Sequence, residues 1–253
     1  MTKQINRKLI LEKLIDALKP LDYVYALWEG GAAAFNRVDD WSDIDLQVNV
    51  EDDKVEVVFE LVEEVLQQLS PIQRKLEMPQ PAWHGHYQTF YKLEDTSEFL
   101  VIDFVVMKHS NPNKFLEKEI HGNAIFHFQK IDMTPFMKLD HEQFKQKLDQ
   151  RLIELNQRFQ MFQFLVPKEF YRNNYIEALE FYYRMSLDPL VELLRIKYKP
   201  YHYNFRTRYV YYDLPEEIVE KLEDLYFIPN KKEILDKHQE VIDWFNQLMQ
   251  EDF

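Results

Sequence analysis

The fold of the first half of the chain is decided by residues 23–50, YVYALWEGGAAAFNRVDDWSDIDLQVNV. The opening YVYALW run is aromatic and β-branched, so it predicts a buried strand. Gly30 and Gly31 follow it, and they predict a tight turn into a short helix because glycine tolerates backbone angles that other residues avoid. The closing IDLQVNV run again has strand character. This order of strand, turn, helix and strand predicts a mixed α+β unit.

The glycine pair is a candidate phosphate contact. Gly30 and Gly31 are two of only four glycines in the chain. Without a Cβ the backbone comes close to a ligand, and a helix that starts here would direct its free N–H groups toward an anion. The alternative is an ordinary turn, because a Gly-Gly pair alone is a weak functional signal.

Two aspartates open the strand that follows. Asp43 and Asp45 are two residues apart, so on a strand they point to the same face. Two like charges this close are tolerated best when a divalent cation lies between them, and ligands made only of oxygen suit Mg²⁺ or Mn²⁺. The alternative is a solvated pair of aspartates in a chain that has 44 acidic residues.

A third carboxylate lies in the apolar run FLVIDFVVM, residues 99–107. A carboxylate inside such a strand is costly unless it is paired, protonated or bound to a metal. The alternative for Asp103 is a sheet-edge aspartate bonded to the backbone or to an arginine. If this strand is a neighbour of the one that carries Asp43 and Asp45, the three carboxylates converge in the arrangement that two-metal nucleotidyl transfer needs.

The combination of Gly-Gly, Asp-x-Asp and a later strand aspartate resembles the polymerase-β-type nucleotidyltransferase superfamily over about residues 20–108. The helical second half is similar in layout to the branch of bacterial aminoglycoside and lincosamide nucleotidyltransferases. The resemblance implies that Asp43 and Asp45 bind the metals, that Asp103 helps to activate the acceptor hydroxyl, and that Gly30 and Gly31 line the triphosphate of an NTP, with ATP the first choice.

The sequence departs from the superfamily pattern at one place: many members carry arginines soon after the glycine pair. Here Ala32-Ala33-Ala34 follows, and Arg37 is the first cation to come after it. Missing positive charge could come from a run without acidic residues between Arg195 and Tyr212, whose candidate nucleotide contacts are Lys197, Lys199, Arg206 and Arg208. The alternative is a set of cations at a helix C-terminus followed by a packed aromatic loop.

Two weaker candidates remain. His84 and His86 have the spacing of metal ligands, but structural histidines at a strand start are favoured over a metal site. One of Glu177, Glu180 and Glu192 could be a general base, although most acids on such a helix form its solvated face.

Beyond these motifs the pattern predicts helices at 4–19 and 55–69, strands at 86–93 and 99–107, and a helix opened by Asn111-Pro112-Asn113 and closed by Gly122. Long helices are expected at about 140–165, 168–198, 214–227 and 230–250, with Pro189 breaking or kinking the second. We therefore expect an α+β fold: a nucleotidyltransferase catalytic domain at 1–138, with a mixed sheet flanked by helices, and an all-helical domain at 139–253 that closes on substrate or nucleotide.

Composition narrows the function. The chain has 253 residues, a formal net charge of −13 and no cysteine, which excludes disulfides, thiol catalysis and cysteine-bound zinc. The acidic balance disfavours an extended nucleic-acid partner and is compatible with a small cationic acceptor. No uninterrupted apolar run predicts a signal peptide or a membrane span, so a cytoplasmic location is expected, and the aromatic-rich helical half is compatible with a homodimer.

The function expected from these features is metal-dependent transfer of a nucleoside monophosphate to a hydroxyl of a small, aminoglycoside-like acceptor, with release of pyrophosphate. The alternative is a nucleotide-binding or regulatory protein, such as an antitoxin-like partner, that keeps the fold without turnover.

Overall fold

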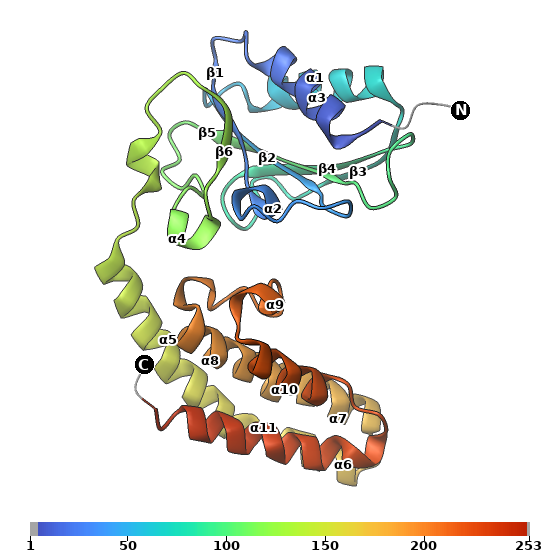
Figure 1. Cartoon of the computed structure of the whole chain (residues 1–253), viewed down its shortest axis with the longest axis vertical. Coiled ribbons are helices and arrows are strands. Elements are labelled where there is room, and N and C mark those ends of the chain that lie inside the picture. The colour runs from blue at the N-terminus through green and yellow to red at the C-terminus, as the bar shows by residue number, and fades with distance from the viewer. Residues whose placement is uncertain (1–4, 252–253) are drawn as a thin grey trace. The chain divides into compact units, whose positions relative to one another are not determined.

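The computed structural model describes residues 5–251, and the chain divides into two compact units, Met1–Leu139 and Asp140–Phe253. The division lies one residue after the expected boundary. The expected α+β class is confirmed: the first unit contains a six-stranded mixed sheet and the second is helical (Figure 1). Among the described residues, no helix has the length and apolar character that crossing a membrane requires.

The sheet of the first unit has the strand order β3-β4-β5-β2-β1-β6. Its strands are β1 (Val24–Glu29), β2 (Ile44–Val50), β3 (Ile72–Glu77), β4 (Tyr87–Leu93), β5 (Ile102–Lys108) and β6 (Ile125–Gln129). Among the strands of the described residues, β2 and β5 pair in parallel and the other neighbours are antiparallel. The strand predicted to carry Asp103 is therefore the direct neighbour of the strand that carries Asp45.

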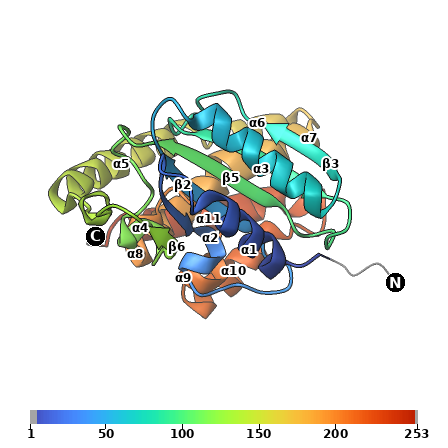
Figure 2. The same ribbon diagram turned by 90° about the horizontal axis from the view of Figure 1, so that it is seen from above.

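Helices α1 (Arg7–Leu18) and α3 (Val55–Leu69) lie side by side on one face of this sheet (Figures 1 and 2). The side chain of Asn6 caps α1 by accepting a hydrogen bond from the backbone N–H of Leu9, at 3.0 Å. Ile10, Leu14 and Leu18 recur every four residues and are buried, so one stripe of α1 faces the core. Residue 4, the expected first residue of this helix, lies outside the described part of the chain.

Between β5 and β6 the structure corrects one prediction. The helix expected to start at Asn111-Pro112-Asn113 is reduced to the single turn α4 (Lys118–His121). The side chains of Asn111 and Asn113 accept hydrogen bonds from the backbone two residues on, which gives turns in place of helical bonds. Phe115 also has a φ of 54°, which a right-handed helix does not allow.

The second unit is a set of helices packed around its own core. Its helices are α5 (His141–Phe162), α6 (Leu165–Tyr171), α7 (Tyr175–Phe181), the π-helical η2 (Tyr182–Leu187), α8 (Asp188–Tyr198), α9 (Val210–Asp213), α10 (Glu216–Tyr226) and α11 (Ile234–Leu248), with short 3₁₀ turns at Pro200–His202 and Lys231–Glu233. The single helix expected at 168–198 is divided at Asn173, whose φ is 64°.

Pro189 does not break this helix; a π-helical turn precedes it instead. Proline has no N–H for the carbonyl of Met185, four residues earlier. The side-chain amide of Gln163 donates to that carbonyl at 2.8 Å and to the carbonyl of Phe159 at 3.0 Å. Its Oε1 accepts from Ser186 at 2.8 Å and from His238 at 2.9 Å. One glutamine therefore satisfies the polar groups where three helices meet.

Candidate active site

The three predicted carboxylates meet at one edge of the parallel β2–β5 pair; we call Asp43, Asp45 and Asp103 the carboxylate edge. Asp45 and Asp103 are register partners on the two strands, so their side chains lie on the same face of the sheet. Asp43 comes just before β2 and is exposed, and its Oδ1 accepts a hydrogen bond from the backbone N–H of Val101 at 3.2 Å. The strands that carry Asp45 and Asp103 are therefore neighbours, and Asp43 is close enough for its charge to act on Asp103; metal binding by the three carboxylates stays a prediction.

Arg7 and Glu29 brace this edge from α1 and β1. The guanidinium of Arg7 donates to the backbone carbonyl of Asp43 and to the carboxylate of Glu29. Glu29 is buried and also pairs with His127 at 3.1 Å. These contacts fix the start of β2 against the end of β1, which positions Asp43.

Asp103 has a pKa that is raised well above its ordinary value. Burial raises the pKa of Asp103 to about 7; the hydrogen bond from Gln88 opposes the rise, and the charges of Asp45 and Asp43 add to it. The side-chain amide of Gln88 donates to Oδ1 at 2.8 Å and to Oδ2 at 3.0 Å. Gln88 thereby holds both oxygens of Asp103 in one orientation.

A directional chain of hydrogen bonds sets the orientation of Gln88. The backbone N–H of His86 donates to Nδ1 of His84 at 3.3 Å, so a neutral His84 carries its proton on Nε2. That Nε2–H donates to Oε1 of Gln88 at 3.1 Å, which directs the NH₂ group of Gln88 toward Asp103. His84 thus acts through Gln88, as a positioning residue.

Gly31 is packed directly against Asp45. Its φ is +50°, and a Cβ added to it would lie 1.8 Å from Oδ2 of Asp45, so no side chain fits there. The N–H of Gly30 donates to the backbone carbonyl of Asp45 at 3.0 Å. The helix that follows, α2 (Gly31–Ala34), has only four residues, which is too short for the macrodipole expected to favour an anion. The glycines therefore make room for Asp45, and their contact with a triphosphate stays a prediction.

The donor set of the carboxylate edge fits a hard divalent cation. All its candidate ligand atoms are oxygens, and the pKa of Asp103 is raised by burial and, to a smaller extent, by the negative charges of Asp45 and Asp43. Among residues 5–251, no group of three or more His, Asp or Glu side chains is placed so that it could hold a metal ion by itself. Mg²⁺ is commonly bound by one or two carboxylates together with substrate phosphates and water, so an incomplete protein cage is compatible with it.

The predicted cationic contacts have local partners. Arg37 lies over the ring of Phe35, 5.1 Å from its centroid. In the helical unit, Lys197 pairs with Glu251, and Lys199 ends α8 through its backbone N–H, which donates to the carbonyl of Arg195. Arg208 lies 4.4 Å from the centroid of Phe205, and Arg206 pairs with Asp188 at 2.7 Å. Their role in nucleotide binding stays a prediction.

Arg195, which begins this basic run, has a structural task. It is fully buried and donates to the backbone carbonyls of Arg206 and Arg208 and to Asp213 at 2.9 Å. Arg195 therefore fixes the loop between α8 and α9. This agrees with the alternative interpretation of the basic run, in which cations at a helix C-terminus are followed by a packed aromatic loop.

The general-base candidates on the helices are not equivalent. Glu192 is held by Arg151 through two hydrogen bonds, at 2.5 and 2.9 Å. Glu180 pairs with Arg184 at 2.5 Å, and Glu177 is exposed. Gln88 was not predicted as a site residue, because its contact with Asp103 depends on the pairing of β4 with β5.

Comparisons with known proteins add one distant similarity. No protein-family model matches the sequence, and no curated protein matches it significantly. A crystal structure of an aminoglycoside 6-adenyltransferase from Bacillus subtilis aligns with a TM-score of 0.39 and 12% sequence identity, over 97% of this chain and 89% of that chain. At these values the similarity assigns no substrate and no residue role to the present chain.

Proposed function

We propose that the chain transfers a nucleoside monophosphate from an NTP, with ATP as the first candidate, to a hydroxyl group of a small acceptor and releases pyrophosphate. The observation that supports this most directly is the register of Asp45 and Asp103 on adjacent parallel strands, with Asp43 two residues before Asp45. The resemblance of the Gly-Gly, Asp-x-Asp and strand-aspartate order to nucleotidyltransferases supports the same reaction. In this proposal the first unit is the catalytic domain and the helical unit closes on substrate or nucleotide.

The residues divide the chemistry between them. Bound to Asp43 and Asp45, Mg²⁺ or Mn²⁺ would supply charge neutralisation for the triphosphate. Asp103 accepts the proton of the acceptor hydroxyl, while Gln88 holds its carboxylate in place. The hydroxyl oxygen forms a bond to the α-phosphorus, the bond from that phosphorus to the β-phosphate oxygen breaks, and pyrophosphate leaves.

The acceptor in this proposal is small, and a cationic one suits the chain best. The net charge of −13 raises the local concentration of cations through the long-range field. An aminoglycoside-like compound, which is polyhydroxylated and cationic, has both properties. Such an acceptor offers several hydroxyl groups to Asp103.

The second candidate is a nucleotide-binding protein without turnover. It is favoured by the contact of Gln88 with both oxygens of Asp103, because the amide competes with an acceptor hydroxyl for these oxygens. Both candidate functions include nucleotide binding, and only the first includes product formation.

Pyrophosphate release tests the proposal. The full-length chain is incubated with each of the four NTPs and Mg²⁺, with and without a panel of aminoglycosides and other small polyols, and the acceptors are then weighed by mass spectrometry. We expect pyrophosphate and a nucleotidylated acceptor from one combination, and loss of both in Asp103→Asn. Nucleotide binding with no product from any acceptor would favour the second candidate.

A further inference from the structure

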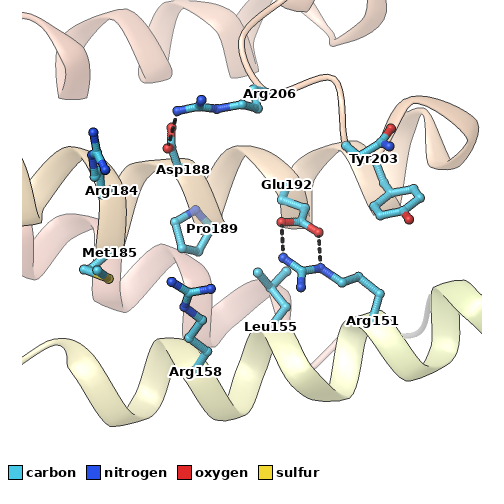
Figure 3. Close-up of a pocket in the computed structure, with 11 residues that line it drawn as sticks. Arg151, Leu155, Arg158, Arg184, Met185, Asp188, Pro189, Glu192, Tyr203 and Arg206 are labelled. Carbon is cyan, nitrogen blue, oxygen red and sulfur yellow. Dashed lines mark hydrogen bonds and ion pairs between the residues drawn. The ribbon is translucent and has the colours of Figure 1, made fainter. Parts of the chain in front are cut away.

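A cavity of about 610 Å³ that is rich in arginine lies within the helical unit (Figure 3). It lies between α5, η2, α8 and the loop at 203–206, and its size is in the range typical of small-ligand sites, roughly 300–1,000 Å³. Four arginines line it: Arg151, Arg158, Arg184 and Arg206.

The lining is positive in a strongly negative chain. Two carboxylates, Asp188 and Glu192, share the cavity with the four arginines, so the formal charge of the lining is 4 − 2 = +2. The whole chain has a formal net charge of −13. A local reversal of this kind favours an anionic ligand.

One arginine is a fixed part of the wall. Arg151 donates to both oxygens of Glu192, at 2.5 and 2.9 Å, and both side chains are largely shielded from solvent. A bidentate pair of this kind is geometrically rigid. Arg151 and Glu192 therefore shape the cavity while their charges compensate each other.

The other three guanidinium groups can change partners at little cost. Arg206 and Arg184 are 71% and 68% exposed, and each makes a single ion pair, with Asp188 and Glu180 respectively. Exposed pairs of this type contribute little stability. Arg158 is exposed, and within residues 5–251 it makes no ion pair or hydrogen bond. Figure 3 shows its side chain directed from α5 toward Pro189.

Apolar groups complete the lining. Leu155 and Pro189 lie among the arginine side chains in Figure 3, and the ring of Tyr203 lies at one end. A ligand in the cavity therefore meets both guanidinium groups and hydrocarbon or aromatic surface.

We propose that this cavity is a binding site for a small organic phosphate. The planar, permanently charged guanidinium fork matches the oxygens of a phosphate group. Arg158 binds the phosphate, Arg184 and Arg206 add positive charge to the lining, and the apolar wall holds the organic body. Binding requires neither a metal ion nor the carboxylate edge, so the site is independent of the proposed nucleotidyl transfer.

Calorimetric titration without Mg²⁺, in EDTA, tests this site on the full chain. Adenosine 5′-monophosphate carries both the phosphate group and the organic part of the proposed ligand. Pyrophosphate has phosphate groups alone, and adenosine has the organic part alone. We expect heat of binding from the monophosphate and from pyrophosphate, and at least about tenfold weaker binding of adenosine, because hydrogen bonds to charged groups carry most of the affinity. Adenosine that binds as tightly as its monophosphate, or no binding by any of the three at millimolar concentration, overturns the proposal.

Matched variants locate the site. Arg158→Ala should weaken binding of the monophosphate about tenfold, whereas Lys147→Ala, which removes one exposed positive charge from the same helix outside the cavity, should leave it unchanged. Asp188→Asn removes the carboxylate that competes for Arg206 and should tighten binding several-fold. Equal effects of Arg158→Ala and Lys147→Ala, or a loss of binding in Asp45→Asn, would assign the anion to another part of the chain and overturn the proposal.

Discussion

Gly31 is the residue at which the backbone is most tightly fitted to the carboxylate edge. Its left-handed φ is one reason for glycine, and the 1.8 Å that would separate an added Cβ from Oδ2 of Asp45 is another. The left-handed φ costs about 1 kcal/mol of stability when any other residue is introduced. A Cβ at this position would also displace the carboxylate of Asp45, a candidate metal ligand, so the substitution should impair binding as well as stability.

We expect Gly31→Ala to lose Mg²⁺-dependent nucleotide binding as well as stability, because the added methyl group must push the carboxylate of Asp45 aside. Gly85→Ala is the matched control. Gly85 also has a left-handed φ, of +84°, but its nearest atom to an added Cβ is 3.4 Å away. Chemical denaturation and nucleotide titration of both variants check this. Equal binding by the two variants would show that Gly31 has only a conformational role.

Gln88 is the residue whose side chain we expect to control Asp103. Gln88→Leu removes both hydrogen bonds to the carboxylate and leaves a similar volume. Hydrogen bonds to charged groups contribute about 1.5–3 kcal/mol, so their loss should raise the pKa of Asp103 further, and the rate of nucleotidyl transfer near pH 7 should fall about tenfold or more. The pyrophosphate-release assay measures the change, and Gln67→Leu, on the surface helix α3, serves as the control. An unchanged rate in Gln88→Leu would contradict a role of Gln88 at Asp103.

The sequence was sufficient to predict the three aspartates as candidates for one site on neighbouring strands. It was not sufficient to predict the side chains that orient Asp103, which are Gln88 and His84. Asp43 and Asp45 were predictable because a strand has a period of two, and Asp103 because a charge in an apolar strand is costly. Gln88 contacts Asp103 because β4 pairs with β5 in an antiparallel register, and His84 in turn contacts Gln88. Such a relation appears only when strand neighbours and register are known.

At the scale of the elements, α11 carries a buried histidine whose protonation opposes folding. Burial lowers the pKa of His238 to about 4, and its Nε2–H donates to Gln163. The unfolded state, with an ordinary histidine pKa of about 6.5, binds more protons than the native state between these two values. Stability contributed by the neutral histidine is therefore present above pH 6.5 and is lost as the pH falls toward 4.

The free energy of unfolding should fall by roughly 1–2 kcal/mol between pH 6.5 and pH 5 because of His238 alone. His238→Gln keeps a donor for Gln163 and removes the titration, so its stability should depend less on pH over this range. Urea denaturation at a series of pH values, followed by the fluorescence of the tryptophans, checks this. Identical pH profiles for the two proteins would contradict the assignment.

Elements with a strong apolar pattern were predicted well, and those without one were not. The expected and observed bounds of β2 and α3 agree because their apolar residues recur at periods of two and about four. The exposed strand β3, with the sequence IQRKLE, was missed because it has no buried face to leave a pattern. The π-helical turn before Pro189 was also missed, since it depends on Gln163, which is 22 residues from the carbonyl that it satisfies.

At the scale of the whole molecule, each unit has its own hydrophobic core. In the first unit the residues of α1, α3 and the sheet pack together, and in the second the helices surround a stacked pair, Phe159 and Phe245, with ring centroids 3.6 Å apart. Because the two cores are separate, we expect a destabilising substitution in one unit to leave the stability of the other unit unchanged.

Phe245→Ala should destabilise the helical unit by about 3–5 kcal/mol, because it removes a buried aromatic ring and leaves a cavity. Hydrogen exchange followed by mass spectrometry should show faster exchange in α5, α8 and α11 and unchanged protection in β2 and β5. A matching loss of protection in the sheet would show that the two units unfold as one.

The proposed metal-nucleotide site is tested most directly by calorimetric titration of a non-hydrolysable ATP analogue into the full chain, with Mg²⁺ and with EDTA. We expect binding that requires Mg²⁺, is abolished in Asp45→Asn, and is retained in Asp40→Asn, which removes one charge from an exposed position in the preceding loop. Binding that is equal with and without Mg²⁺, or equal in the two variants, would contradict a metal-nucleotide site at Asp43, Asp45 and Asp103.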